Sequence, residues 1–85
     1  MPRFFFDLHN SLGLVRDDEG QVVPDEAAAR AVALDNIRSL LSAEVRAGAL
    51  DLRGRIDVRA EGGGMVLRVP FDEAVRVRPA GKGAE

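Results

Sequence analysis

The sequence has no cysteine, tryptophan or tyrosine, and its single histidine is His9. The absence of cysteine excludes disulfides, thiolate metal sites and cysteine nucleophiles. One histidine cannot form a histidine pair around a metal ion. With 12 basic and 14 acidic residues, the net charge of −2 provides no overall attraction to nucleic acid or to anionic lipid. Several common kinds of functional site are therefore excluded by composition.

Long apolar runs are absent as well. No segment approaches the roughly 20 apolar residues of a membrane-spanning helix, so we expect no membrane partner. The apolar run after Arg3 ends at Asp7, which is shorter than the apolar centre of about 7 to 15 residues in a secretory signal. We therefore expect no export signal, with the cytoplasm as the default location.

The remaining composition is that of an ordinary globular domain, with 46% hydrophobic and 31% charged residues in a chain of 85. A chain of this length has room for one hydrophobic core. We predict a single domain over residues 1–78. The Gly- and Lys-containing residues 79–85 are expected to form a disordered tail.

Three of the four phenylalanines occupy positions 4 to 6, in the segment RFFFDLHN. Side chains alternate between the two faces of a β-strand, so Phe4 and Phe6 share one face. Phe5 shares the other face with Asp7 and His9. We predict an N-terminal strand whose Phe4 and Phe6 are core anchors and whose Phe5 lies on the opposite face.

The next segment contains an acidic turn, DDEG, between two short apolar stretches at residues 14–16 and 21–23. Asp and Glu suit a turn, and Gly20 can adopt a positive φ. The pattern predicts a short, exposed hairpin in which these two stretches pair with each other.

A long amphipathic helix is predicted from Glu26 to about Ala47. Asp25 is a suitable N-cap after Pro24, and Gly48 suits the position after the C-cap. At 100° per residue, Val45 lies at the margin of one broad apolar face. That face consists of Ala29, Ala33, Leu34, Ile37, Leu40 and Leu41.

A second hairpin is predicted in RIDVRAEGGGMVLRV, with the turn at EGGG. Ile56 and Val58 face inward, whereas Asp57 and Arg59 face outward. Pro70 ends the second strand, and FDEAVRV forms either one helical turn or a last extended segment. The predicted fold class is α+β: a small antiparallel sheet of two hairpin-like strand groups, with one long amphipathic helix packed on one face.

Two segments superficially match ligand loops. DDEG contains clustered carboxylates but lacks the alternating oxygen ligands of a calcium loop. EGGG precedes a strand, whereas a phosphate-binding loop precedes a helix. Both segments are interpreted as turns, and no cofactor or metal is expected.

The segments MPRFFFDLHN, DDEGQVVPDEAAARAVAL, GRIDV and VPFDEAV together resemble a small bacterial family of domains of unknown function, family 6894. That family typically begins M-P-R-[YF]-[FY]-F and has a D-x-E-G-x-x-x-P-D-x-x-x-A junction between the acidic turn and the helix. The resemblance covers residues 1 to 78 and implies a stand-alone α+β domain. It implies no activity and no site residue.

The sequence predicts a role other than catalysis, because it offers no nucleophile–base pair, ligand set or phosphate cradle, and no small-molecule substrate is evident. One helix covers one face of a sheet, which leaves Phe5 on an open face. An apolar patch of that kind often marks an interface. We therefore predict that the open face or an edge strand mediates association, as a homodimer or with another protein.

The alternative function is a nucleic-acid-binding or antitoxin-like regulatory domain. The order of short strands and helix is similar to the partial ribonuclease-H-like domain of antitoxins that neutralise messenger-cleaving toxins, an analogy of topology alone. The outward arginines Arg59 and Arg68 beside Phe5 would then contact phosphates. Cross-strand pairs between these arginines and the outward Asp7 and Asp57 explain the same pattern without a ligand.

Overall fold

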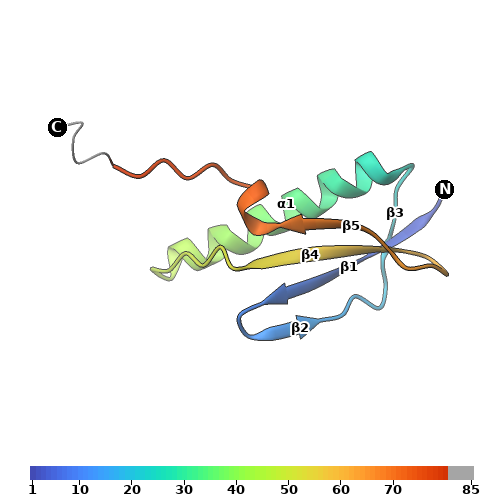
Figure 1. Ribbon diagram of the computed structural model, residues 1–85, viewed down its shortest axis with the longest axis horizontal. Coiled ribbons are helices and arrows are strands. Elements are labelled where there is room, and N and C mark those ends of the chain that lie inside the picture. Colours follow the sequence, from blue (N-terminus) through green and yellow to red (C-terminus); the bar gives the residue numbers. More distant parts are fainter. Residues whose placement is uncertain (81–85) are drawn as a thin grey trace.

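An antiparallel sheet and one helix form two layers in the computed structural model, which describes residues 1–80 (Figure 1). The predicted α+β class is confirmed. Most of the tail predicted for residues 79–85 lies outside the described residues. In chain order the elements are β1 (Arg3–Asn10), β2 (Gly13–Val15), β3 (Gln21–Val22), α1 (Glu26–Arg46), β4 (Gly54–Ala60), β5 (Met65–Pro70) and the 3-10 helix η1 (Phe71–Glu73).

The strand β1 organises the sheet. The order of the strands is β2-β1-β4-β5, and β3 also pairs with β1. On one side β1 pairs with β4 along its length, with Phe6 opposite Val58. On the other side β2 pairs with the end of β1, with Leu8 opposite Val15, and β3 pairs with its beginning, with Arg3 opposite Val22.

The predicted hairpin between residues 14–16 and 21–23 is therefore wrong. The chain reverses earlier, because the Oδ1 atom of Asn10 accepts a hydrogen bond of 2.9 Å from the N–H of Leu12, an Asx turn that closes a hairpin between β1 and β2. With its eight residues, β1 is long enough for β2 and β3 to occupy the same edge one after the other. The acidic DDEG segment bridges them along that edge and closes no hairpin.

The helix α1 begins and ends as its sequence predicts. The Oδ1 atom of Asp25 accepts a hydrogen bond of 2.8 Å from the N–H of Ala28, as an N-cap should. The C-cap is Ala47, and Gly48 follows with φ 93°. Within residues 1–80, no helix is both long and apolar enough to cross a membrane. The fully covered side of α1 consists of Ala29, Ala33, Ile37 and Leu41.

The core lies between α1 and the sheet and is completed by η1. Phe71 has no exposed surface and is the largest fully buried side chain. Its ring fits against Gly54, where a Cβ atom would lie 2.6 Å from a ring carbon. Of the two predictions for FDEAVRV, the helical turn is confirmed at Phe71–Glu73. The other buried core residues include Phe4, Ile56, Val58 and Val69.

Phe6 is less buried than predicted. Phe4 is 4% exposed, but Phe6 is only partly buried at the margin of the core. The reason is the position of α1, which contacts β4, β5 and η1. Figure 1 shows the helix beside β5 and β4, with β2 and the adjoining part of β1 uncovered. Phe4 is therefore a fully buried core residue, and Phe6 packs against the core from its margin.

This difference predicts unequal losses of stability on truncation. Phe4→Ala and Phe71→Ala should each lower the free energy of unfolding by about 3 to 5 kcal/mol, since each leaves a cavity in a closed core. Phe6→Ala should cost about half as much, because part of its ring already contacts water. Urea denaturation of the three variants measures the order. A loss for Phe6→Ala equal to that for Phe4→Ala would contradict the partial coverage described above.

Candidate interaction surfaces

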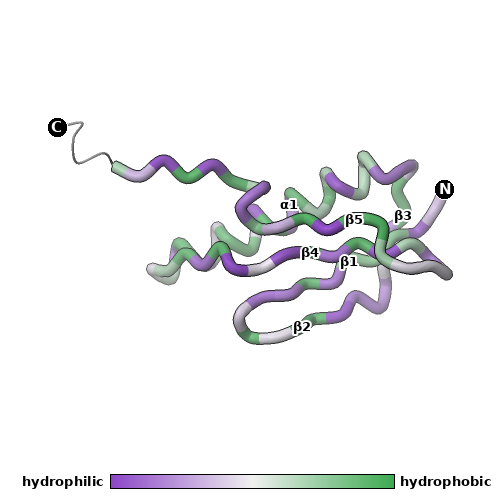
Figure 2. The backbone as a smooth tube through the Cα atoms, viewed as in Figure 1, coloured by the Kyte–Doolittle hydropathy of each residue, from purple (hydrophilic) through white to green (hydrophobic). Residues whose placement is uncertain are grey.

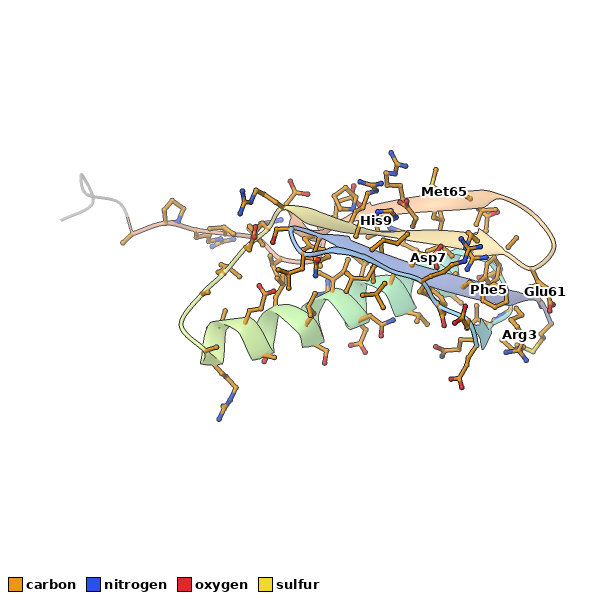
Figure 3. The ribbon with its side chains drawn as sticks, turned by 90° about the horizontal axis from the view of Figure 1, so that it is seen from below. Arg3, Phe5, Asp7, His9, Glu61 and Met65 are labelled. Atoms are coloured by element: carbon orange, nitrogen blue, oxygen red, sulfur yellow. The ribbon has the colours of Figure 1, made fainter. Side chains whose placement is uncertain are left out.

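The open face is the side of the sheet that points away from α1. Figure 3 shows Asp7, His9 and Met65 on this side, with the helix on the other. Its remaining members follow from the strand register, in which Phe5 pairs with Arg59 and Asp57 with Arg68. We define the open face by Phe5, Asp7 and His9 of β1, Arg55, Asp57 and Arg59 of β4, and Met65 and Arg68 of β5.

Arg59 and Asp7 form a two-point ion pair at the centre of this face. The Nε atom of Arg59 lies 2.6 Å from Oδ2 of Asp7, and Nη2 lies 3.1 Å from Oδ1. Nη2 also donates to the backbone carbonyl of Asp17, at 3.0 Å. The guanidinium carbon lies 4.9 Å from the centroid of the Phe5 ring, a distance suited to a cation–π contact. Phe5 is therefore half-buried beneath an arginine.

A second buried carboxylate, Asp57, gathers the other basic groups of the open face. Its Oδ1 atom accepts hydrogen bonds from the Nε atoms of Arg55, at 3.1 Å, and Arg68, at 3.0 Å. The Nε2 atom of His9 lies 3.2 Å from Oδ2. The cross-strand pairing of arginines with Asp7 and Asp57 that the sequence suggested is confirmed. The positive groups of this face are directed toward the protein's own carboxylates.

The acidic loop closes the outer edge of β1 between β2 and β3. The Oδ2 atom of Asp17 accepts a hydrogen bond of 3.0 Å from the N–H of Phe6, a group with no strand partner on that side. Its Oδ1 atom accepts from the N–H groups of Glu19 and Gly20. Gly20 has φ 70°, and a Cβ atom there would lie 2.7 Å from the Phe4 carbonyl oxygen. Only glycine fits this close approach without strain.

These contacts change the acidity of both carboxyl groups. The Arg59 guanidinium holds the pKa of Asp7 below its ordinary value, and the pKa of Arg59 is raised in turn. Burial alone would raise the pKa of Asp17, but the backbone N–H groups of Phe6, Gly20 and Glu19 outweigh it and lower the pKa. Both carboxyl groups are therefore held in their charged form.

The two edges of the sheet differ. One edge is formed by β2 and β3, strands of only three and two residues, which together with the Asp17 carboxylate cover the outer side of β1. The strand β5 pairs with β4 on one side, and no strand among residues 1–80 pairs with its other side. The side chain of Met65 at its start is 51% exposed. A free edge of this kind can pair with a strand of another chain.

A family model described as Domain of unknown function (DUF6894) matches residues 3–72. The chain belongs to this family. The DUF6894 match spans all elements from β1 to Asp72 in η1 and includes the whole open face. No curated protein and no solved structure matches the chain.

The structure brings two of the three predicted interaction residues together. Phe5 and Arg59 are stacked, whereas Arg68 lies across β4 on a different carboxylate, Asp57. Sequence reasoning missed Asp17, whose role depends on the N–H of Phe6, eleven residues away. The spacing from Asp17 to Gly20 carries a local signal, because an Asp often accepts the N–H groups two and three residues later.

The depressed pKa of Asp7 predicts loss of stability in acid. An unfolded Asp has a pKa of about 3.9, above that of folded Asp7, so its contribution is complete above about pH 5 and declines as the pH falls through the folded pKa. Asp7→Asn should lower the free energy of unfolding at pH 7 by about 2 to 3 kcal/mol and flatten its decline below about pH 4. Urea titrations at several pH values measure both effects. An unchanged acid slope in Asp7→Asn would contradict this assignment.

The ion pairs also predict weak binding to nucleic acid. Arg59 and Arg68 already contact carboxylates, so phosphate contacts would have to replace existing pairs. At about 50 mM salt, dissociation constants for single- and double-stranded RNA and DNA should be weaker than about 10⁻⁴ M. Fluorescence anisotropy with labelled oligonucleotides measures this affinity. Micromolar binding that is lost in Arg59→Ala or Arg68→Ala, and that weakens steeply with salt, would favour the nucleic-acid function instead.

Proposed function

We propose that this chain is a protein-interaction module that forms a two-fold homodimer through the free edge of β5. The observation that carries the proposal is the difference between the two edges of the sheet. One edge ends in the short strands β2 and β3, of three and two residues, and the carboxylate of Asp17 accepts the N–H of Phe6 between them. The other is a six-residue strand without a partner on its outer side among the described residues. Antiparallel pairing of two β5 strands would give one continuous sheet.

The open face is a weaker candidate for this association. Phe5, the residue that first suggested an interface there, is half-buried under Arg59 and against Gly20. The buried carboxylates Asp7 and Asp57 are occupied by arginines of the same chain. A partner at this face would have to displace these pairs, at the cost of unpaired buried charge. The free edge of β5 requires no such exchange.

Features at both ends of β5 restrict how two copies can pair. The register shifts between Val58 and Arg59 of β4, so Met65 lies beyond an irregularity. Pro70 at the other end has no N–H to donate. Pairing centred on Leu67 uses the regular middle of the strand. It places each Arg68 opposite Val66 of the second copy and keeps like charges from lying directly opposite.

The proposed role is non-enzymatic. The side chains of the open face that have acid–base chemistry, Asp7, Asp57 and His9, take part in ion pairs with arginines or with each other. Asp17 holds backbone N–H groups. Each of these groups therefore has a structural contact that accounts for its position.

Met65→Lys should shift the protein toward monomer. The substitution places a charged side chain on the unpaired edge strand of each copy, a feature that opposes pairing of one edge strand with another. Leu14→Lys is the matched control, because Leu14 is 54% exposed on the opposite edge, in β2. Light scattering after size-exclusion chromatography should give twice the mass of one chain for the native protein and for Leu14→Lys.

Both variants should keep the helical circular dichroism of the native protein, since both side chains are exposed. The proposal is wrong if the native protein is monomeric at about millimolar concentration, where even weak specific dimers form. It is equally wrong if Leu14→Lys dissociates the dimer and Met65→Lys does not, because the association would then use the β2 edge.

A further inference from the structure

A groove with an apolar floor lies between the second half of α1 and the extended segment after η1. In Figure 1 this segment leaves η1 beside the second half of the helix and then extends away from the rest of the fold. Figure 2 shows hydrophobic and hydrophilic residues alternating along it. The floor of the groove includes Leu41 and Val45 of α1, Leu50 of the following loop, and Val77. We call it the helix–tail groove.

Three apolar side chains of this groove are largely exposed and are not part of the buried core. Val45, Leu50 and Val77 are 55%, 50% and 54% exposed, although each belongs to a residue type that is usually buried. Single exposed apolar residues are common, but three that line one concave surface are not. Val45 lies at the margin of the helix face that α1 packs on the sheet, and no later segment among residues 1–80 covers it.

The charged side chains that line the helix–tail groove are all positive, and Ser42 is its one neutral polar residue. Arg38, Arg46 and Arg76 line it, and no carboxylate of the described residues does. Arg38 donates its Nε–H to the carbonyl of Ala74, at 2.7 Å, which fixes the guanidinium and leaves its other N–H groups available. The carboxylate of Glu73 is paired with Arg30, and Asp72 and Glu73 line the adjoining hollow, which shares Arg38 and Arg76. The lining of the groove itself therefore combines an apolar floor with arginines and without a carboxylate.

We propose that the helix–tail groove binds an acidic amphipathic helix of a partner protein. Apolar residues of that helix would cover Val45, Leu50 and Val77, and carboxylates on its flanks would pair with Arg38, Arg46 and Arg76. From Arg38 to Arg46 the groove wall spans nine residues of α1, about 12 Å from the first to the last. That length accommodates two to three turns of a docked helix.

The chemistry of the groove favours another protein over a second copy of this chain. The helix α1 already packs its apolar face on its own sheet, and residues 1–80 contain no other helix longer than the three residues of η1. A second copy therefore has no free amphipathic helix to insert. The concave arrangement also favours a helix over a lipid surface, because membrane-bound apolar residues project from a convex or flat face.

A designed peptide tests the charge and the shape of the occupant. We would use a helical peptide of about 16 residues, a length at which helices become stable enough to dock, with leucine on one face and glutamate on both flanks. The matched control peptide carries lysine in place of every glutamate. On the full ¹⁵N-labelled chain, the acidic peptide should shift the amide signals of Leu41, Val45, Leu50 and Val77 and leave those of Phe5 and Arg55 unchanged. The lysine peptide should bind at least about 10-fold more weakly.

Variants locate the site. Arg46→Glu and Leu50→Lys should each weaken binding of the acidic peptide by about 10-fold or more, and Arg16→Glu, an exposed arginine outside the groove, is the matched control and should leave it unchanged. The groove does not require the β5 dimer, so Met65→Lys should bind the acidic peptide as the native protein does.

Three results would overturn the proposal. The first is equal binding of the acidic and basic peptides, and the second is the absence of shifts in the groove residues at millimolar peptide. The third is a native chain that does not bind the peptide but sediments with vesicles containing about one-quarter anionic lipid, an association that Arg46→Glu abolishes. That result would assign the groove to a membrane surface instead.

Discussion

A single helix has to shield a sheet that is four strands wide and open on both faces. The helix α1 covers β4 and β5 on one face, and the consequences extend through the molecule. Phe6 lies in the part of β1 that the helix leaves uncovered, so its side chain is only half-buried. The other face receives no helix, so it cannot be apolar. It is closed by two buried carboxylates and the arginines around them, with Phe5 held beneath one of those arginines.

The pair of Asp7 and Arg59 links the parts of this arrangement. It joins β1 to β4, and through the N–H and the carbonyl of Asp17 it connects the acidic loop to the same carboxylate and guanidinium. The acidic loop in turn satisfies the N–H of Phe6, which lies between the short edge strands β2 and β3. The opposite edge is the longer, six-residue strand β5, whose outer side has no strand partner within residues 1–80. The proposed association follows from that difference.

Local rules predicted the parts of the fold that depend on neighbouring residues. The caps of α1, the turn after Ala60 and the alternation along β4 all follow from residue type and spacing within a few positions. The pairing of Asp7 and Asp57 with arginines also followed, because both carboxylates have outward parity in adjacent strands. The confirmed features share this short range.

The features that were predicted wrongly or not predicted at all involve contacts between residues far apart in the chain. The pairing of residues 21–23 depends on how much of β1 remains unpaired after β2 has bound to its end. The local sequence pattern does not show this, so it could not distinguish pairing with 14–16 from pairing with β1. The burial of Phe71 depends on the space that Gly54 leaves beside it. The helix–tail groove forms only where the segment after η1 passes the second half of α1. The sequence pattern therefore does not indicate that Val45 and Val77 line the same surface.

Amide hydrogen exchange measured by NMR at two protein concentrations tests the central claim, that the free edge of β5 is the site of association. The account predicts that outward N–H groups of β5 exchange about 10-fold or more slowly at the higher concentration. The N–H of Phe6, already bonded to Asp17, serves as the internal reference and should not change. Exchange in β5 that is independent of concentration, or protection that appears instead along β2, would contradict the account.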